Sequence, residues 1–497
     1  MVHCILSVPI RKTKPKNFMP NYKEQLQKKL QPFQQEHLLT FWDSLLKTEQ
    51  QQLAAQIENI DFALINTLYQ KRNEPAQSLA FADKAQDPPA YQFSTVPNPL
   101  PVKNRKKITA EEAIQAGTTA LQSGKVAAAL VAGGQGTRLG FPKPKGMFPI
   151  GPVTGKTLFQ IHFEKVLAAS RKYGQRIPYC IMTSSATHSE TVDFLKENNY
   201  FGIDSDDVFV FCQGTMPAVD LVTGKILLAE KYSLALSPDG HGGMLAAITK
   251  KGNCPVRGEN YSVLETLRQR GIEYLFYHQV DNPLVKICSP EYLGYHILSG
   301  SEMTSQVIRK KNPMDKVGNV VEADGHLSVI EYSDLPESVA AQTNSDGSLK
   351  IWAGSIAVHI FNTEFLGRQA QRKDALPFHF ARKKVPHLDL HTGAEVKPEK
   401  ENALKFERFI FDLMPAAENS IVVEVDPPNH YAPLKNKDTK DCPETVKRDM
   451  SAQFIRWLRG AGVEIADGAV LEISPLIADS PEVLKFNSTA KLPSAPF

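Results

Sequence analysis

A glycine-rich stretch is the part of this sequence whose residues and spacing point most directly to chemistry. Residues 132–140 read Ala-Gly-Gly-Gln-Gly-Thr-Arg-Leu-Gly, and Phe-Pro-Lys-Pro-Lys-Gly follows at once. Glycines let backbone N–H groups approach phosphate oxygens with no Cβ in the way. Arg138 and Lys145 supply positive charge for a polyphosphate, the first through a planar fork and the second as a point charge. The stretch therefore indicates a phosphate-binding loop.

Two other phosphate-binding motifs are near misses in this region. The dinucleotide fingerprint G-x-G-x-x-G begins correctly at Gly134 and Gly136, but its last glycine would fall on Leu139. The P-loop pattern ends correctly at Gly155-Lys-Thr, but its first glycine would fall on Ile150. Hydride transfer and P-loop ATP hydrolysis are therefore disfavoured.

The loop needs a strand before it and a helix after it, and the sequence supplies both. Residues 126–131 form a short apolar run typical of a buried parallel strand, and a helix is predicted over 157–173. A helix at 110–123 precedes them, and further strands are predicted at 179–182, 208–211, 274–280 and 305–308. This alternation predicts an α/β fold with a central doubly wound sheet.

Changes in composition along the chain predict three domains. Apolar residues at helical spacing between 38 and 60, followed by prolines between 88 and 101, make 1–106 a helical N-terminal region and linker. Residues 107–439 form the predicted main α/β domain. Short β-prone pieces at 463–476 predict that 440–497 form a small β-rich C-terminal domain.

The overall composition excludes several classes of protein. A chain of 497 residues with 42% hydrophobic and 22% charged residues is typical of a globular protein with several domains. A net charge of +3 is small for a nucleic-acid binder, and six cysteines without a C-x-x-C pair disfavour a disulfide scaffold or zinc site. No apolar run reaches the roughly 18 residues that cross a bilayer. We therefore expect a cytoplasmic protein that binds neither nucleic acid nor membrane.

Residues 133–140, together with Pro144-Lys-Gly, resemble the signature of the UDP-sugar pyrophosphorylases. The resemblance covers most of the chain and is nearest to the eukaryotic UDP-N-acetylglucosamine pyrophosphorylase branch. It implies a Rossmann-like, GT-A-like nucleotidyltransferase sheet and an enzyme that forms UDP-sugar and pyrophosphate from UTP and a sugar 1-phosphate. The other matching stretches, in the family's order, begin at Gln213, Pro238, Gln279, Val329, Ala353, Lys405, Ala432 and Glu472.

The resemblance also implies roles for individual residues on the nucleotide side. Arg138 and Lys145 hold the β and γ phosphates and the departing pyrophosphate, and Lys435 holds the incoming sugar phosphate. No general base is expected, because a phosphate monoester is already an anion near neutral pH. Mg²⁺ is the expected cofactor, held by Asp281, with Asp412 as a weak candidate for a second ligand. The implied nucleotide-binding residues are Val131, Ala132, Gly133, Gly134, Lys145, Gln213, Gly240, Asp281 and Lys405.

The sugar is the part of the implied function that stays open. The N-acetylglucosamine branch usually has Asn where this chain has His241 and Ser355. N-acetylglucosamine 1-phosphate is the first expectation, and glucose 1-phosphate or a broad range of sugars is the alternative. A glycosyltransferase that consumes UDP-sugar and an inactive nucleotide sensor are rival classes, and the protein is expected to be a monomer or a homodimer. The implied sugar-phosphate contacts are His241, Glu331, Tyr332, Ser355 and Lys435.

Overall fold

The computed structural model of the protein describes residues 21–74, 82, 84–97, 106–254, 260–372 and 374–487. Residues 1–20 and 98–105, which the sequence assigned to the N-terminal region and linker, lie outside these ranges. The chain forms two compact units. The smaller draws on residues 21–74, 216–237 and 380–406, and the larger on 75–215, 238–379 and 407–497.

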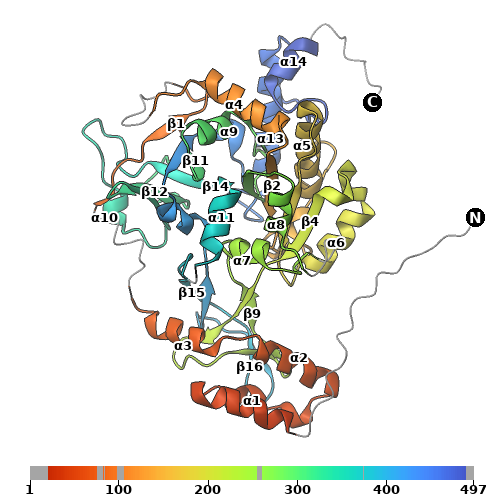
Figure 1. Ribbon diagram of the computed structural model, residues 1–497, viewed down its shortest axis with the longest axis vertical. Coiled ribbons are helices and arrows are strands. Elements are labelled where there is room, and N and C mark those ends of the chain that lie inside the picture. Colours follow the sequence, from red (N-terminus) through yellow and green to blue (C-terminus); the bar gives the residue numbers. More distant parts are fainter. Residues whose placement is uncertain are drawn as a thin grey trace, which may run out of the picture. The chain divides into compact units, whose positions relative to one another are not determined.

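A ten-stranded sheet forms the centre of the larger unit (Figure 1). The strand order is β1-β19-β11-β14-β10-β2-β3-β4, and the hairpin β12–β13 joins the sheet beside β14. The strands are β1 (Ala90–Gln92), β2 (Val126–Val131), β3 (Tyr179–Thr183), β4 (Val208–Cys212), β10 (Tyr274–Gln279), β11 (Met303–Arg309), β12 (Gly318–Ala323), β13 (His326–Ile330), β14 (Ala353–Asn362) and β19 (Ser420–Glu424).

Most neighbouring strands on the main path of this sheet run parallel. β10, β2, β3 and β4 are parallel to one another in turn, whereas β14 is antiparallel to both β10 and β11. All six residues of β2 are buried, as expected for a parallel strand that is covered on both faces. The five predicted strands correspond to β2, β3, β4, β10 and β11, and the predicted α/β fold with a mostly parallel central sheet is confirmed.

Helices cover both faces of the sheet, and each face has its own hydrophobic cluster. Side chains of α4, α5, α9 and α13 pack with the even-numbered residues of β2, and those of α7, α8 and α11 pack with the odd-numbered ones. This division follows from the alternation of side chains along a strand. The helices are α4 (Ala110–Gln122), α5 (Leu158–Tyr173), α6 (His188–Glu197), α7 (Gly243–Thr249), α8 (Val263–Gln269), α9 (Pro290–Leu298), α10 (Glu337–Ala340), α11 (Thr363–Ala370), α12 (Pro427–His430), α13 (Pro443–Gly460) and α14 (Pro481–Asn487).

The smaller unit combines the N-terminal helices with short strands from two later segments. The side-chain amide of buried Gln35 donates to the Gly224 carbonyl at 3.2 Å and accepts from the Ile226 N–H at 2.9 Å. These contacts explain why residues 216–237, predicted within the α/β domain, belong with the N-terminal helices. The elements are α1 (Tyr22–Leu30), α2 (Lys47–Glu58), α3 (Phe62–Lys71), β6 (Val219–Asp220), β7 (Leu228–Glu230), β8 (Ser233–Leu234), β16 (His387–Leu388) and β17 (Glu395–Val396).

Four further strands each span a point where the chain passes from one unit to the other. β5 pairs with β9, and β15, β18 and β6 form a three-stranded sheet. These strands are β5 (Thr215–Pro217), β9 (Leu236–Pro238), β15 (His379–Lys383) and β18 (Ala403–Glu407).

The predicted linker contains a strand. β1 pairs in parallel with β19 at the edge of the main sheet. Pro88 and Pro89 lie immediately before this strand, where the missing N–H removes no hydrogen bond from the ladder. Pro88 and Pro89 therefore mark the start of an edge strand. The sequence analysis predicted only a linker here, because prolines are frequent between residues 88 and 101.

The C-terminal stretch differs from its predicted β-rich character. Within residues 440–487 the structure contains the helices α13 and α14 and no strand. Leu471 and Ile473, which suggested strands, pack against the large core instead. The Leu471 N–H donates to the Ser451 hydroxyl at 2.8 Å, so side chains take the place of a neighbouring strand.

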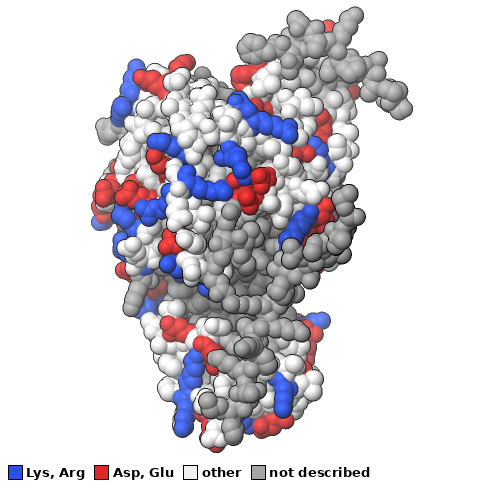
Figure 2. All heavy atoms as spheres, turned by 45° about the vertical axis from the view of Figure 1, so that its right-hand side comes forward, with Lys and Arg blue, Asp and Glu red and all other residues white. Residues whose placement is uncertain are grey.

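In the described ranges, no helix is both long and apolar enough to cross a bilayer. On the face in Figure 2, basic and acidic side chains are interspersed, which is consistent with the small net charge.

Candidate active site

The glycine-rich loop leaves the carboxyl end of β2 and folds back on itself. Val131 and Ala132 are buried, and the Ala132 N–H still donates to the Met182 carbonyl on β3 at 2.8 Å. Further along, the Lys145 N–H donates to the Gly134 carbonyl at 3.0 Å and closes the loop. A Cβ on Gly134 would meet no atom within 4 Å. The loop therefore presents open backbone at Gly134, which phosphate oxygens can approach.

Gln213 lies against this loop and is held by two acceptors. Its side-chain amide donates to the Asp239 carboxylate at 3.3 Å and to the Gly240 carbonyl at 3.2 Å. A Cβ on Gly133 would stand 2.6 Å from Gln213 Oε1, so a larger residue at 133 would displace the Gln213 amide. With its NH₂ group engaged, Gln213 turns Oε1 toward the glycine-rich loop.

Asp239 and Arg408 form a buried ion pair that sequence reasoning missed. The Asp239 side chain is 3% exposed, and its carboxylate accepts from Arg408 Nη2 at 2.5 Å. Gly240, with φ of +82°, passes so close to Arg408 that a Cβ would lie 2.4 Å from its carbonyl oxygen. The only sequence signal was an acidic residue inside the turn Pro238-Asp-Gly240.

His241 is held in one tautomer. Its Nδ1 accepts from the Ile410 N–H at 3.2 Å, and its ring stacks on Phe409 with centroids 5.1 Å apart. Burial, with a smaller contribution from His379, lowers the pKa of His241 to about 4. The ring is therefore neutral at pH 7 and carries its proton on Nε2, which makes Nε2 a hydrogen-bond donor.

Glu331 and Ser355 lie on either side of one glycine. A Cβ on Gly318 would be 3.6 Å from Glu331 Oε1 and 3.7 Å from Ser355 Cβ. Burial raises the pKa of Glu331 to about 7, although the nearby His379 lowers it in part. Tyr332, which follows Glu331, is 42% exposed and is therefore not a core residue.

His379 and Asp412 form a second pair that the sequence did not reveal. Their side chains are 2.7 Å apart, between His379 Nε2 and Asp412 Oδ2, and the His379 ring packs against Phe409 at 4.5 Å. Burial works to lower the pKa of His379, but the Asp412 carboxylate outweighs it and the net shift is upward. Nothing in the local sequence around His379 indicates this partner, which lies 33 positions further along the chain.

Asp281, Lys145 and Lys435 are brought together at the end of β10. The Leu434 N–H donates to the Asp281 carbonyl at 2.8 Å, and the Lys145 ammonium donates to the Leu434 carbonyl at 3.4 Å. Lys435 Nζ donates to the Tyr431 hydroxyl at 3.2 Å. Burial works to lower the pKa of Lys435, but Tyr431 and Asp281 raise it overall. Lys435 therefore keeps its positive charge at neutral pH.

The other two predicted cationic residues, Arg138 and Lys405, lie on separate elements. Arg138 is exposed on a short 3-10 turn, Thr137–Leu139. Lys405 lies on β18 in a segment of the smaller unit. Their roles toward the nucleotide stay predictions.

The site offers few protein carboxylates that could bind Mg²⁺. In the part of the chain that the structure describes, no group of three or more His, Cys, Asp or Glu residues could hold a metal ion. Asp412 pairs with His379 through Oδ2, and its role as a second ligand stays a prediction. Mg²⁺ commonly binds one or two carboxylates together with substrate phosphates and water, so Asp281 alone is compatible with it.

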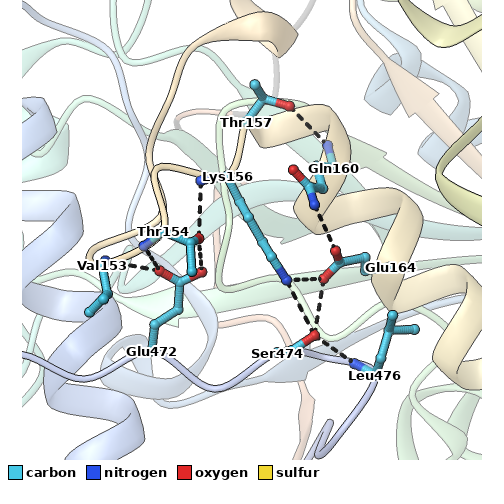
Figure 3. Close-up of polar contacts among 9 residues, drawn as sticks. All are labelled: Val153, Thr154, Lys156, Thr157, Gln160, Glu164, Glu472, Ser474 and Leu476. Carbon is cyan, nitrogen blue, oxygen red and sulfur yellow. Dashed lines mark hydrogen bonds and ion pairs between the residues drawn. The ribbon is translucent and has the colours of Figure 1, made fainter. Parts of the chain in front are cut away.

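Two residues of the C-terminal stretch, Glu472 and Ser474, bind the loop that leads from the glycine-rich region into α5 (Figure 3). We call this pair the latch. Glu472 accepts from the N–H groups of Val153 and Thr154 at 2.9 and 2.8 Å. Lys156 Nζ lies 2.7 Å from the Glu164 carboxylate and 3.3 Å from the Ser474 hydroxyl. The C-terminal stretch thereby fixes the start of α5, and through it the segment that follows Lys145.

Comparisons with known proteins agree with this arrangement. Residues 83–442 match a model of the family described as UTP–glucose-1-phosphate uridylyltransferase. The chain is 33% identical to UDP-N-acetylhexosamine pyrophosphorylase-like protein 1 of Mus musculus, over 94% of this chain and 95% of that protein. It is 33% identical to UDP-N-acetylglucosamine pyrophosphorylase of Saccharomyces cerevisiae, over 90% and 94% of the two chains. The crystal structure of the Trypanosoma brucei UDP-N-acetylglucosamine pyrophosphorylase, 26% identical, matches with a TM-score of 0.78 over 96% and 98%.

Proposed function

Because this chain belongs to the UTP–glucose-1-phosphate uridylyltransferase family, we propose that it forms UDP-N-acetylglucosamine and pyrophosphate from UTP and N-acetylglucosamine 1-phosphate. It is a nucleotidyltransferase by family. The yeast and trypanosome relatives are named for N-acetylglucosamine, and this supports the choice of sugar. Glucose 1-phosphate is the second candidate, because His241 and Ser355 stand where the N-acetylglucosamine branch usually has Asn.

The observation that carries the proposal is the meeting of Gln213 with the glycine-rich loop. A primary amide whose NH₂ group is engaged by Asp239 and Gly240 offers its Oε1 to a donor such as the N3–H of uracil. The open backbone at Gly134 then lies on the phosphate side of the same loop. A uracil nucleotide satisfies both features at once.

The cations fit in-line attack of the sugar phosphate oxygen on the α-phosphorus of UTP. Lys145 and Arg138 would stabilise the charge that develops on the departing pyrophosphate, and Lys435 would hold the incoming phosphate. The nucleophile is already an anion, so catalysis rests on positioning and charge rather than on a general base. Lys435 suits this role because its raised pKa keeps it protonated.

Mg²⁺ would be held by Asp281 and the phosphates of UTP, where it supplies positive charge to the triphosphate. The protein's own contribution is to orient the ligands. Asn282, next in the chain, accepts from the Ala432 N–H at 3.1 Å and donates to the His430 carbonyl at 2.8 Å. This links the strand end that carries Asp281 to the segment that carries Lys435.

His241 and Glu331 are the proposed sugar contacts. The His241 Nε2–H can donate to an acetamido carbonyl, and the Glu331 carboxylate can accept from sugar hydroxyls. Ser355, opposite Glu331 across Gly318, would limit the space beside the sugar. Tyr332 is exposed and is retained only as a contact at the edge of the site.

We place the enzyme in the cytoplasm, as a monomer or homodimer. Cys180, Cys212, Cys254, Cys288 and Cys442 are all free thiols, as is usual in a reducing compartment.

The test is pyrophosphate release from UTP and Mg²⁺ with a panel of sugar 1-phosphates. We expect release with N-acetylglucosamine 1-phosphate and a lower kcat/KM with glucose 1-phosphate. The reverse order would overturn the choice of sugar and keep the reaction. No release with any sugar 1-phosphate would overturn the reaction itself.

A further inference from the structure

A cavity lies away from the residues of the proposed nucleotide and sugar site. It has a volume of about 540 Å³ and is walled by α4, α5, α13, the segment 283–291 and the C-terminal stretch that contains the latch. We call it the α5–α13 chamber. None of Gly133, Gln213, His241, Glu331 or Lys435 lines it. Its volume is in the range of pockets that hold small organic molecules.

The walls of the α5–α13 chamber are rich in aromatic and apolar side chains. Tyr173 from α5 and Phe454 and Trp457 from α13 supply three aromatic rings, and Ile161 and Met450 supply aliphatic surface. Phe454 and Trp457 pack edge to face with centroids 5.8 Å apart. An apolar molecular body can therefore be buried on several sides.

Four lysines line the chamber, together with the acidic residues Glu291, Glu472, Asp479 and Glu482. Three of the lysines have partners. Lys156 pairs with Glu164 at 2.7 Å, Lys172 pairs with Asp479 at 3.1 Å, and Lys165 donates to backbone carbonyls of residues 283 and 285. The ammonium of Lys286 forms no hydrogen bond or ion pair with any described residue. Burial lowers the pKa of Lys286, although Asp426 and other acidic groups oppose the shift. A poorly solvated cation without a partner favours an incoming anion.

We propose that the α5–α13 chamber binds a small amphiphilic anion, whose apolar body lies against Tyr173, Phe454 and Trp457 and whose carboxylate, sulfonate or phosphate pairs with Lys286. The ligand would be distinct from UTP and from the sugar phosphate, because the chamber shares no wall with Gln213 or Lys435.

The floor of the chamber is continuous with the strand end that carries Asp281. Residues 283–288 line the chamber and begin two positions after Asp281. Helix α5 holds both flanks of Asp281: His162 Nε2 bonds the Val280 carbonyl at 3.0 Å, and Lys165 Nζ bonds the Val285 carbonyl at 2.9 Å. A bound anion would contact the segment that positions Asp281.

The test uses anilinonaphthalene sulfonate, an aromatic sulfonate, with the full chain. We expect one saturable fluorescent site whose affinity is unchanged by saturating UTP. Lys286→Gln removes the cation, and Thr118→Phe fills part of the chamber. Each should weaken binding of the probe about tenfold. Two independent variants keep the test decisive if one of them fails to fold, as judged by circular dichroism.

Matched controls separate the chamber from the surface. Lys107→Gln makes the same charge change at an exposed lysine, and Thr119→Phe adds the same ring at the exposed neighbour of Thr118. Both should bind the probe as the parent does. Displacement of the probe by UTP would overturn the proposal in favour of the nucleotide site. Unchanged affinity in both chamber variants would overturn it in favour of binding elsewhere.

Discussion

At the scale of single residues, the glycine-rich loop and the strand end at Asp281 share one lysine. Lys145 closes the loop through its backbone N–H, and its ammonium donates to the carbonyl of Leu434, whose N–H is bonded to Asp281. Lys143, two residues earlier, is exposed and contributes only its carbonyl to the loop. The two lysines therefore offer a matched pair that differs in access to the site.

Lys145→Ala should lower kcat about a hundredfold, because removing one group that stabilises transition-state charge commonly costs that much. Lys143→Ala should leave kcat near the parent value. Steady-state rates of pyrophosphate release measure both. A loss within about tenfold in Lys145→Ala would mean that this lysine has no charge-stabilising role.

Glu331 makes a prediction about stability and pH. Its pKa is raised from 4.5 to about 7, so the folded protein holds a proton that the unfolded chain releases at lower pH. Its contribution to the free energy of unfolding must then fall as pH rises from about 4.5 to about 7. Glu331→Gln should be about 2 kcal/mol more stable than the parent at pH 8 and close to it at pH 5.

Urea unfolding at the two pH values measures this difference. Glu337→Gln makes the same change at an exposed position and should show no such dependence on pH. A Glu331→Gln variant that is less stable than the parent at pH 8 would show that the carboxylate is ionised and stabilising.

Sequence reasoning proposed site residues within glycine-rich or apolar motifs, and their roles stay predictions. It missed Asp239, Arg408 and His379, because their partners lie far away in the chain. The 239–408 and 379–412 pairings depend on how distant segments meet, and no local pattern encodes that. Asp412 was named only as a possible metal ligand, and its pairing with His379 was not foreseen.

At the scale of elements, the predicted strands and helices with strong periodicity match the structure closely. β2 and α4 begin at the predicted residues, because an unbroken apolar run and a capping Thr109 mark them. The antiparallel placement of β14 between β10 and β11 was not predicted, since a strand's own sequence does not state its partner. The β-prone pieces at 463–476 were predicted as strands for the same reason: their own sequence does not show that they have no partner strand.

The latch supports a prediction at this scale. Glu472→Ala removes the acceptor of the Val153 and Thr154 N–H groups and should lower the free energy of unfolding by about 2 kcal/mol. Hydrogen exchange at these two amides should speed up selectively. Glu464→Ala, at an exposed position of the same stretch, serves as the control. Equal exchange in both variants would show that the latch does not hold the loop.

At the scale of the whole molecule, Gln35 tests how the smaller unit is assembled. Gln35→Ala would leave the Gly224 carbonyl and the Ile226 N–H without their partner, at a cost of about 2–3 kcal/mol. Gln31→Ala, at an exposed position nearby, should be close to neutral. Calorimetric unfolding compares the two, and equal midpoints would contradict the assigned role of Gln35.

The smaller unit is built from three separated stretches, residues 21–74, 216–237 and 380–406. On the ribosome, its first helices emerge long before the strands that complete their core. At about 5–20 residues per second, the wait for residue 406 is on the order of tens of seconds. Gln35 lacks its partners until residues 224 and 226 have been made, and the smaller unit stays incomplete until the last stretch, 380–406, follows. We therefore expect newly made chains to be most prone to aggregation before the last stretch has been translated.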